Sequence, residues 1–275
     1  MKLNEALDYG VKKLYKYSDS PEYESMVLLQ EVSGKSKEEI LLKDEFINRK
    51  IFDNFKKIMN KRINGYPIQY IIEKANFLGI EININHNTFI PRSETEYMAH
   101  LAISDCKLIQ NPYILEIGTG SGAIAISLAL NLPTSQIIVT DISLEALYIC
   151  KKNIHIHNLE KKVLPICTDN MEAIKSNKIF DMIISNPPYI AEKDFGSLSE
   201  LVKKEPRVAL DGGIYGTKLI NKILKTSTIM LKRNGILYIE LSKDNIQYLD
   251  IPDNLDYRIL KDQFNEKRIL KALKK

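Results

Sequence analysis

Residues 113–129 read YILEIGTGSGAIAISLA, and this stretch decides the fold class. An apolar run ends at Ile117, glycines follow at Gly118, Gly120 and Gly122, and a second apolar run begins directly after them. The order is typical of a strand, a tight turn and a helix. Glycine gives such a turn its backbone freedom and lets a ligand approach without a β-carbon in the way. We therefore expect a ligand-binding loop here, the alternative being a tight turn without a ligand.

Strand-like and helix-like runs alternate outward from this loop. Short strands separated by helices imply right-handed crossovers and a doubly wound, mostly parallel sheet, so the fold class is α/β. We expect strands at 113–117, 136–141, 163–169, 180–186, 235–241, 257–262 and 267–273, and helices at 93–107, after 122, after 143 and around 215–232.

The first 72 residues have a different pattern, because apolar residues repeat there at helical spacing. Pro21 follows a possible N-cap at Ser20, Gly34 is a helix stop, and Ser36 with Glu39 forms a capping-box pattern. Alternation from about residue 75 to 92 then predicts a β-hairpin. We expect a helical domain at 1–72, a hairpin linker at 73–92 and the sheet domain at 93–275.

Composition bounds the function. Of 275 residues, 44% are hydrophobic and 27% charged, and the net charge of +4 comes from interleaved residues. The sequence contains no basic stripe that would indicate a stable nucleic-acid partner, and no apolar run long enough to indicate a membrane span. We expect a cytoplasmic protein without a metal site, because the cysteines lack C-x-x-C spacing and the histidines lack ligand spacing with them. These residues are Cys106, Cys150, Cys167, His86, His100, His155 and His157.

Acidic residues around the loop favour one cofactor over another. Asp141 ends the next expected strand, where its carboxylate can accept hydrogen bonds from both hydroxyls of a ribose. Glu116 directly precedes the glycines, and an acid there would repel the pyrophosphate of a nicotinamide dinucleotide. It suits the cationic S-adenosylmethionine instead. Asp169 and Asn170, at the end of the third strand, can reach an adenine.

A second motif, NPPY at residues 186–189, ends the fourth expected strand. Asn-Pro is a common turn opener, so a plain turn is one reading. The other is a cradle for a planar NH2 group. The side-chain oxygen of Asn186 and the backbone carbonyl of Pro187 can each accept one N–H, Pro188 stiffens the turn, and the ring of Tyr189 packs on the flat group. Such a cradle indicates methyl transfer to a planar nitrogen without a strong base.

These motifs, with TDIS at 140–143, resemble those of class I S-adenosylmethionine-dependent methyltransferases, whose sheet is seven-stranded and Rossmann-like. Within this class the chain most resembles the release factor glutamine methyltransferases (the HemK/PrmC family). The further similarity lies in SPEYESMVLLQEVSGKS (20–36), KRINGYPIQYI (61–71), TFIPRSETE (88–96), EPRVALDGGIYGTKLINKI (205–223) and LKRNGILYIEL (231–241).

The resemblance implies methylation of the glutamine side-chain amide in the GGQ motif of peptide chain release factors, with the helical domain helping to dock the factor. It implies a catalytic set of Asn186, Pro187, Pro188 and Tyr189. It implies a cofactor-binding set of Gly118, Thr119, Gly120, Ser121, Gly122, Asp141, Asn170 and Asn186.

Some positions depart from the family pattern. Ser93 stands where proline is usual, Asn170 where tryptophan is frequent, and Met26 where an acid is common. The change at Asn170 weakens the expected packing on the adenine. Four charged residues near the motifs have open roles, either in surface ion pairs or in lining the cleft: Arg92, Glu94, Glu205 and Arg207.

Three rival functions remain. One is a glutamine methyltransferase of a ribosomal protein, which shares most of the motifs. Another is an adenine amino-methyltransferase of DNA, whose cradle holds a flipped base, although such enzymes need basic channel surfaces. The third is a binding module without turnover. We expect a monomeric enzyme acting on a protein.

Overall fold

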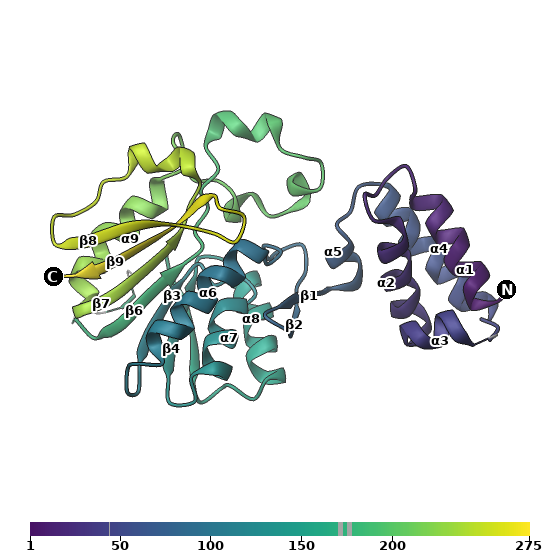
Figure 1. The fold of residues 1–275 in the computed structure, drawn as a ribbon, viewed down its shortest axis with the longest axis horizontal. Coiled ribbons are helices and arrows are strands. Elements are labelled where there is room, and N and C mark those ends of the chain that lie inside the picture. Colours follow the sequence, from purple (N-terminus) through teal and green to yellow (C-terminus); the bar gives the residue numbers. More distant parts are fainter. Residues whose placement is uncertain (44, 170–172, 175–177) are drawn as a thin grey trace. The chain divides into compact units, whose positions relative to one another are not determined.

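The computed structural model describes residues 1–43, 45–169, 173–174 and 178–275. Contacts divide these residues into two compact units. One unit comprises Met1–Lys74 and Ser199–Lys204, and the other comprises Ala75–Leu198 and Glu205–Lys275 (Figure 1).

The first unit is helical. Its helices are α1 (Leu3–Leu14), α2 (Pro21–Ser33), α3 (Lys37–Leu42), α4 (Arg49–Ile63) and α5 (Ile68–Ile72). The capping box and the glycine stop are confirmed, whereas Ser20 stands at the N-cap of α2 without a side-chain capping bond to any described residue. Ser36 accepts from the Glu39 N–H while Glu39 accepts from the Ser36 N–H, and α2 ends at Gly34 with a left-handed φ of 65°.

The core of this unit depends on one close approach between helices. A β-carbon at Gly10 of α1 would lie 2.8 Å from the Phe55 ring of α4, so only glycine lets these helices pack this closely. Buried leucines surround that contact, and each fully buried side chain contributes about 1.5–3 kcal/mol. They are Leu3, Leu14, Leu28 and Leu29.

A two-stranded sheet joins β1 (Lys74–Phe77) to β2 (Ile80–Asn83). The connecting residues Leu78 and Gly79 both have positive φ, of 51° and 79°, as a two-residue hairpin turn requires. The strands end at Asn83, so the sheet is shorter than the alternation through residue 92 indicates. Within 84–92, Asn85 and Thr88 bond each other in a turn instead.

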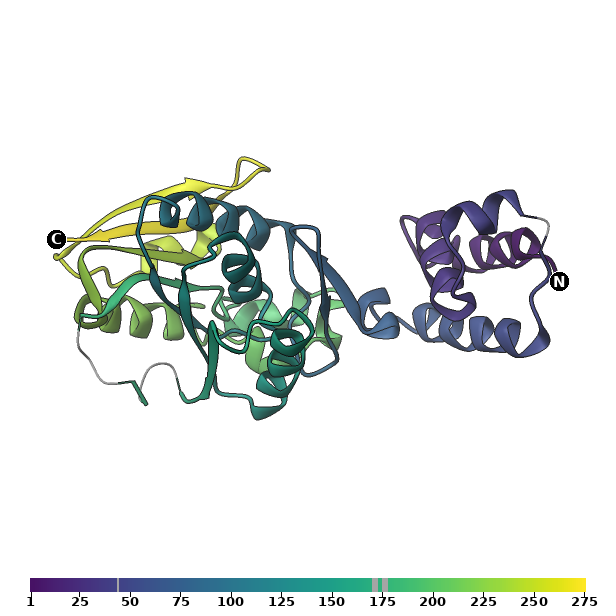
Figure 2. The ribbon, with the colours of Figure 1, turned by 90° about the horizontal axis from the view of Figure 1, so that it is seen from below.

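The second unit contains a seven-stranded sheet of described residues, with order β5-β4-β3-β6-β7-β9-β8. The first five strands in this order pair in parallel, and β9 pairs antiparallel with both β7 and β8. Figure 2 shows β8 and β9 in yellow. The expected mostly parallel, doubly wound sheet is confirmed. The strands are β3 (Tyr113–Ile117), β4 (Gln136–Asp141), β5 (Val163–Cys167), β6 (Phe180–Ser185), β7 (Leu231–Glu240), β8 (Leu255–Lys261) and β9 (Lys267–Lys274).

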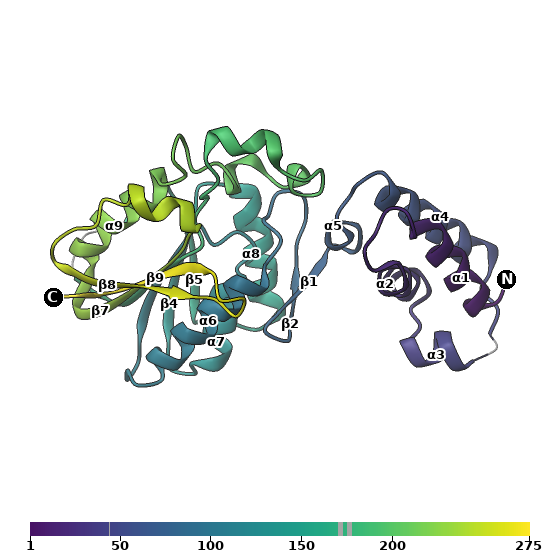
Figure 3. The ribbon, with the colours of Figure 1, turned by 45° about the horizontal axis from the view of Figure 1, so that its top comes forward.

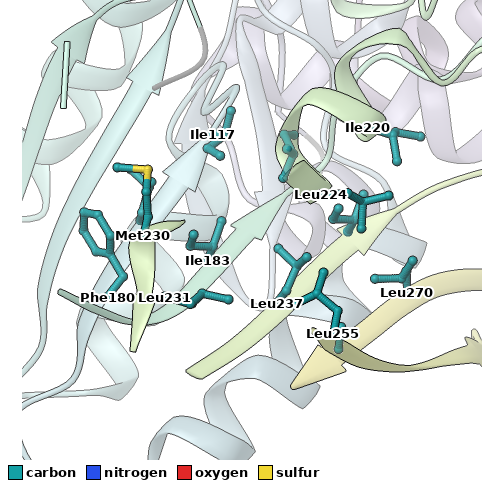
Figure 4. Packing of buried hydrophobic residues seen from close by; sticks show 14 of the residues in the cluster. Ile117, Phe180, Ile183, Ile220, Leu224, Met230, Leu231, Leu237, Leu255 and Leu270 are labelled. Atoms are coloured by element: carbon teal, nitrogen blue, oxygen red, sulfur yellow. The ribbon is translucent and has the colours of Figure 1, made fainter. Parts of the chain in front are cut away.

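Helices cover both faces of this sheet (Figure 3). On one face, Ile220 and Leu224 of α9 (Lys218–Met230) pack against Ile117, Ile183 and Leu237 (Figure 4). Side chains alternate along a strand, so the neighbouring residues point to the other face. There the Met182 sulfur lies 3.6 Å from Cys106 of α6 (Ser93–Cys106), and Tyr238 donates to Asp105. Helices α7 (Ala123–Asn131) and α8 (Leu144–Ile156) follow β3 and β4.

Short 3-10 turns connect the later elements: η1 (Glu192–Ser197), η2 (Val202–Lys204), η3 (Arg207–Ala209) and η4 (Lys243–Tyr248). Within the described parts of the chain, no helix has both the length and the apolar character of a membrane span.

Candidate active site

The two sequence motifs meet at the point where the strand order reverses. Strands β3 and β6 are parallel neighbours whose last residues, Ile117 and Ser185, lie in register, and the Ser185 hydroxyl donates to the Ile117 carbonyl at 2.7 Å. The glycine loop starts one residue after Ile117, and Asn186 follows Ser185. Ligands of open α/β sheets bind at the carboxyl ends of strands at such a reversal. The fold therefore places both motifs at one crevice.

The glycines of the loop have two different surroundings. Gly118 and Gly120 have φ of 70° and 57° and are partly accessible, and no atom of the described residues lies within 4 Å of a β-carbon added to either. Gly122 is buried, and a β-carbon there would lie 2.8 Å from the sulfur of Cys150. The first two glycines border open space, whereas the third lets the loop pack against α8.

Two other loop residues face the protein. Thr119 and Ser121 are only 5% and 3% exposed. The Thr119 N–H donates to the Thr140 carbonyl, and Asn153 donates to the Ser121 carbonyl. Their expected cofactor contacts stay a prediction, and they hold the loop in place.

Asp141 braces the same loop from the end of β4. Its Oδ2 accepts from the Gly120 N–H at 2.8 Å and its Oδ1 accepts from the Ser143 N–H at 2.9 Å. Burial raises the pKa of this carboxyl above its ordinary value. Each carboxylate oxygen can accept more than one hydrogen bond, so both retain capacity for a ribose hydroxyl. Asn170, the other expected polar contact, lies outside the described residues.

The geometry fits S-adenosylmethionine. Open space borders Gly118 and Gly120, and an added β-carbon would project into it. A carboxylate with spare acceptor capacity stands beside that space. The described residues contain no cluster of three or more His, Cys, Asp or Glu that could hold a metal ion.

Glu116, near the end of β3, holds the helix that follows the glycine loop. Its side chain is buried, and Oε2 accepts from the N–H of Ala125 in the first turn of α7 at 2.9 Å. A pyrophosphate would use the amides of this helix N-terminus, and a carboxyl group already holds one of them. The sequence preference against a dinucleotide thus has a structural basis, although the effect of Glu116 on a ligand is indirect.

Glu116 predicts that stability falls as pH rises. Burial raises the pKa of its carboxyl from 4.5 to about 8, so between these pH values the folded protein binds a proton that the unfolded chain has lost. The free energy of unfolding should therefore decrease through this window by at most about 1.4 kcal/mol per pH unit for this group. Urea unfolding at pH 5.5 and 7.5 measures the decrease. It should be smaller in Glu116→Gln, and an equal decrease in both proteins would contradict the prediction.

The NPPY motif lies at the same carboxyl edge of the sheet and carries hydrogen-bond acceptors. Asn186 Nδ2 donates to the Thr95 hydroxyl at 2.9 Å. Among the described residues, no hydrogen bond reaches Asn186 Oδ1 or the Pro187 carbonyl. The Tyr189 hydroxyl donates to Glu240 at 3.2 Å, and burial raises its pKa. The described chain thus binds one N–H of the Asn186 amide and the Tyr189 hydroxyl, and leaves two acceptors for a guest.

The backbone after Pro188 is held by residues from two later segments. Asn245 Nδ2 donates to the carbonyls of both Tyr189 and Tyr215, at 3.2 and 3.0 Å. Ile190 pairs with the segment around Leu210 by its N–H at 3.0 Å. These contacts fix where Tyr189 can lie.

Gly216 should be essential to this arrangement. A β-carbon there would lie 2.2 Å from the Tyr189 carbonyl oxygen, and its φ is 70°. We expect Gly216→Ala to displace the cradle and lower the free energy of unfolding by more than about 2 kcal/mol, with loss of methyl transfer. Chemical unfolding and an activity assay measure the two effects.

Gly79→Ala is the matched control for this substitution. Gly79 has a φ of 79° but no atom within 4 Å of an added β-carbon, so it reports the backbone cost of about 1 kcal/mol alone. Equal destabilisation by both substitutions would show that the contact with Tyr189 is unimportant.

The four charged residues with open roles separate into two groups. Glu205 has a buried side chain, accepts from the Ile90 N–H at 3.0 Å and pairs with Arg92, so it ties the segment before α6 to the segment after NPPY. Arg207 is exposed, pairs with Asp211 at 3.3 Å and lies over the Phe195 ring. Glu94 accepts from the Ser93 hydroxyl. Arg92 and Glu205 are thus structural partners beside the site.

Two family models match this chain, one in the N-terminal helical region and one in the sheet region. Residues 5–72 match the PrmC N-terminal domain, and residues 97–230 match the methyltransferase small domain. A release factor glutamine methyltransferase of Rhodopirellula baltica is 35% identical over 82% of this chain and 79% of its own length. One of Clostridium botulinum is 32% identical over 97% of this chain and 96% of its own. The chain belongs to the release factor glutamine methyltransferase family.

Other relatives of this family member are larger or more distant. A bifunctional methyltransferase of Rickettsia typhi is 32% identical over 91% of this chain, which covers 53% of that protein. Among solved structures, the hMettl16 catalytic domain in complex with an RNA hairpin aligns with a TM-score of 0.55 at 17% identity, over 70% of this chain and 75% of that one. The second similarity supports the class I methyltransferase fold alone.

Proposed function

We propose that this chain transfers a methyl group from S-adenosylmethionine to the side-chain amide nitrogen of the glutamine in the GGQ motif of peptide chain release factors. The observation that carries the proposal is a pair of acceptors that no described residue uses, Asn186 Oδ1 and the Pro187 carbonyl, one strand away from the glycine loop. Family membership supports the protein substrate.

When bound, S-adenosylmethionine supplies an electrophilic methyl group. Gly118 and Gly120 would border the bound cofactor, and Asp141 would bind the hydroxyls of its ribose. On the acceptor side, Asn186 Oδ1 and the Pro187 carbonyl each accept one N–H of the glutamine amide and so fix the orientation of its plane. Because the nitrogen lone pair lies along the normal of that plane, the two bonds direct it toward the methyl group. The Tyr189 ring lies against that plane, and Pro188 stiffens the turn.

The reaction needs positioning more than a base. One N–C bond forms from the nitrogen lone pair, and one S–C bond breaks with its electron pair left on the sulfur. The nitrogen then loses one proton to solvent water, which leaves an N-methyl amide. In the transition state the nitrogen carries partial positive charge. The negative ends of the two acceptor dipoles face its N–H groups, and this stabilises the transition state. The chain's contribution is thus geometry and two fixed dipoles.

The partner assignments belong to the proposal. The enzyme acts as a cytoplasmic monomer, docks the release factor through residues 1–72, and holds no nucleic acid stably. Interleaved charges and a net charge of +4 support the last point. Residues 1–72, 73–92 and 93–275 are the proposed docking, linker and catalytic segments.

Methyl transfer to competing acceptors tests the proposal. Purified protein and labelled S-adenosylmethionine are offered a release factor, the same factor with its GGQ glutamine replaced, ribosomal proteins and duplex DNA. We expect label on the intact factor only. Label on a ribosomal protein or on DNA would establish the corresponding rival function, and cofactor binding without transfer to any acceptor would indicate a binding module.

A further inference from the structure

The amide of Asn186 can face the crevice in two ways that differ by a half-turn of its side chain. In one orientation, the Asn186 oxygen faces the guest and can accept an N–H from it. In the other, the Asn186 NH2 group faces the guest and repels the NH2 group of the guest amide. The two orientations have nearly the same shape, so packing alone cannot choose between them. The choice must come from hydrogen bonds behind the amide.

A chain of buried polar groups stands behind Asn186. Its Nδ2 donates to Thr95 Oγ1 at 2.9 Å, and Thr95 Oγ1 donates to Glu240 Oε2 at 2.6 Å. Glu240 Oε1 accepts from the Tyr189 hydroxyl at 3.2 Å. Thr95 and Glu240 are 4% and 1% exposed, and they come from α6 and the end of β7. Sequence separations of 91 and 145 residues explain why motif analysis missed both contacts.

The chemistry of these groups sets a direction along the chain. An ionised carboxylate can only accept hydrogen bonds, so the Thr95 hydroxyl must donate its single proton to Glu240. The lone pairs of that hydroxyl then face Asn186, which must donate to them from its NH2 group. Its oxygen is left facing the crevice. A half-turn would instead set two acceptor oxygens against each other in a buried place, at considerable cost.

We propose that Thr95 and Glu240 are positioning residues, which fix the orientation of the Asn186 amide so that its oxygen faces the substrate nitrogen. The same carboxylate holds Tyr189 through its hydroxyl, so one group orients both side chains of the cradle. This inference rests on the proposed function for its kinetic tests, and on the contacts alone for its structural test.

The charges around Glu240 link the relay to pH. Arg268 favours the carboxylate, Glu94 opposes it, and Thr95 and Tyr189 donate to it, while burial has the largest effect and raises the pKa of Glu240 to about 7. Below that pH the carboxyl carries a proton and can donate to Thr95. The direction of the chain is then no longer enforced. The turnover number should fall as pH decreases through about 7, and this acid limb should be absent in Glu240→Gln.

A double-mutant cycle tests the relay. Thr95→Val keeps the shape and removes the hydroxyl, so we expect it to lower the turnover number roughly 10- to 100-fold at saturating cofactor, with cofactor affinity changed less than about three-fold. Thr95→Ser should recover most of the rate. In an Asn186→Ala background, Thr95→Val should have almost no further effect, because the group it positions is gone. An equal effect in both backgrounds, or no effect in either, would overturn the proposal.

Ser227→Ala is the control for loss of a buried hydroxyl. Ser227 donates to the Leu224 carbonyl within α9 at 2.8 Å, on the opposite face of the sheet from α6. It should lower stability without changing turnover. If Thr95→Val acted only by weakening the fold, its turnover number would fall no more than that of Ser227→Ala at an equal loss of thermal stability. A larger fall in Thr95→Val therefore reports positioning.

A spectroscopic measurement separates this inference from the proposed function. Selective 15N-asparagine labelling gives the Asn186 NH2 signal, assigned by its loss in Asn186→Ala. We expect Thr95→Val to shift that signal and speed its hydrogen exchange, whether or not a release factor is methylated. An unchanged signal would overturn the relay, whereas an inactive wild-type protein with the expected signal change would overturn only the substrate assignment.

Discussion

Asn186→Ala should leave the cofactor bound and abolish most turnover. We expect the S-adenosylmethionine dissociation constant to stay within a few-fold of wild type, and the turnover number to fall by roughly two or more orders of magnitude. The reason is that Asn186 faces the guest with one oxygen and Thr95 with its NH2 group, so it orients the reacting nitrogen. Calorimetric titration and steady-state kinetics give the two quantities.

The control for this substitution is another asparagine with a single hydrogen bond. Asn131, at the C-terminal end of α7 and so at the opposite end of this helix from the glycine loop, donates to the Ser127 carbonyl at 2.9 Å. Asn131→Ala should change neither quantity. A parallel loss of cofactor affinity and turnover in Asn186→Ala would mean that Asn186 acts on the cofactor.

Asp141→Ala should have the opposite effect. The substitution removes the acceptor for ribose hydroxyls and releases the Gly120 and Ser143 amides that it holds. We expect cofactor affinity to fall roughly 10- to 100-fold, consistent with losing charge-assisted hydrogen bonds, while turnover at saturating cofactor stays within a few-fold. Isothermal titration with S-adenosylmethionine measures the affinity.

Asp141→Asn separates the two tasks of this side chain. The amide keeps one acceptor oxygen in place of two and carries no negative charge, so its hydrogen bonds to the loop and to a ribose hydroxyl are fewer and weaker, and we expect an intermediate affinity. Unchanged affinity in Asp141→Ala would show that the carboxylate is only a loop brace and that the ribose is bound elsewhere.

The sequence was sufficient where structure depends on neighbouring residues. The strand-glycine-helix order at 113–129, the capping box at Ser36 and the stop at Gly34 are local signals, and all appear in the fold. The meeting of the two motifs followed from topology, because parallel strands bring their carboxyl ends to one edge. The boundaries were less accurate: the hairpin ends at Asn83, and α9 begins at Lys218 rather than near 215.

The pairing of the long-range polar contacts had no signal in the sequence. Thr95 and Glu240 lie in two of the segments that carry the family resemblance, 88–96 and 231–241, but their contact appears only when the fold brings them together. The same holds for Asn245, which binds two carbonyls from different segments. Glu116 also needed the structure, since only its burial and its bond to Ala125 show that its carboxyl group holds an amide at the N-terminus of α7.

Mapping the methyl group on the product decides whether the GGQ glutamine is the acceptor. A release factor is incubated with the enzyme and S-adenosylmethionine, digested, and sequenced by tandem mass spectrometry, with Asn186→Ala as the inactive control. We predict one added methyl group on the side-chain nitrogen of the GGQ glutamine and none elsewhere. A methyl group on another residue of the factor, or an equal yield from Asn186→Ala, would contradict the account.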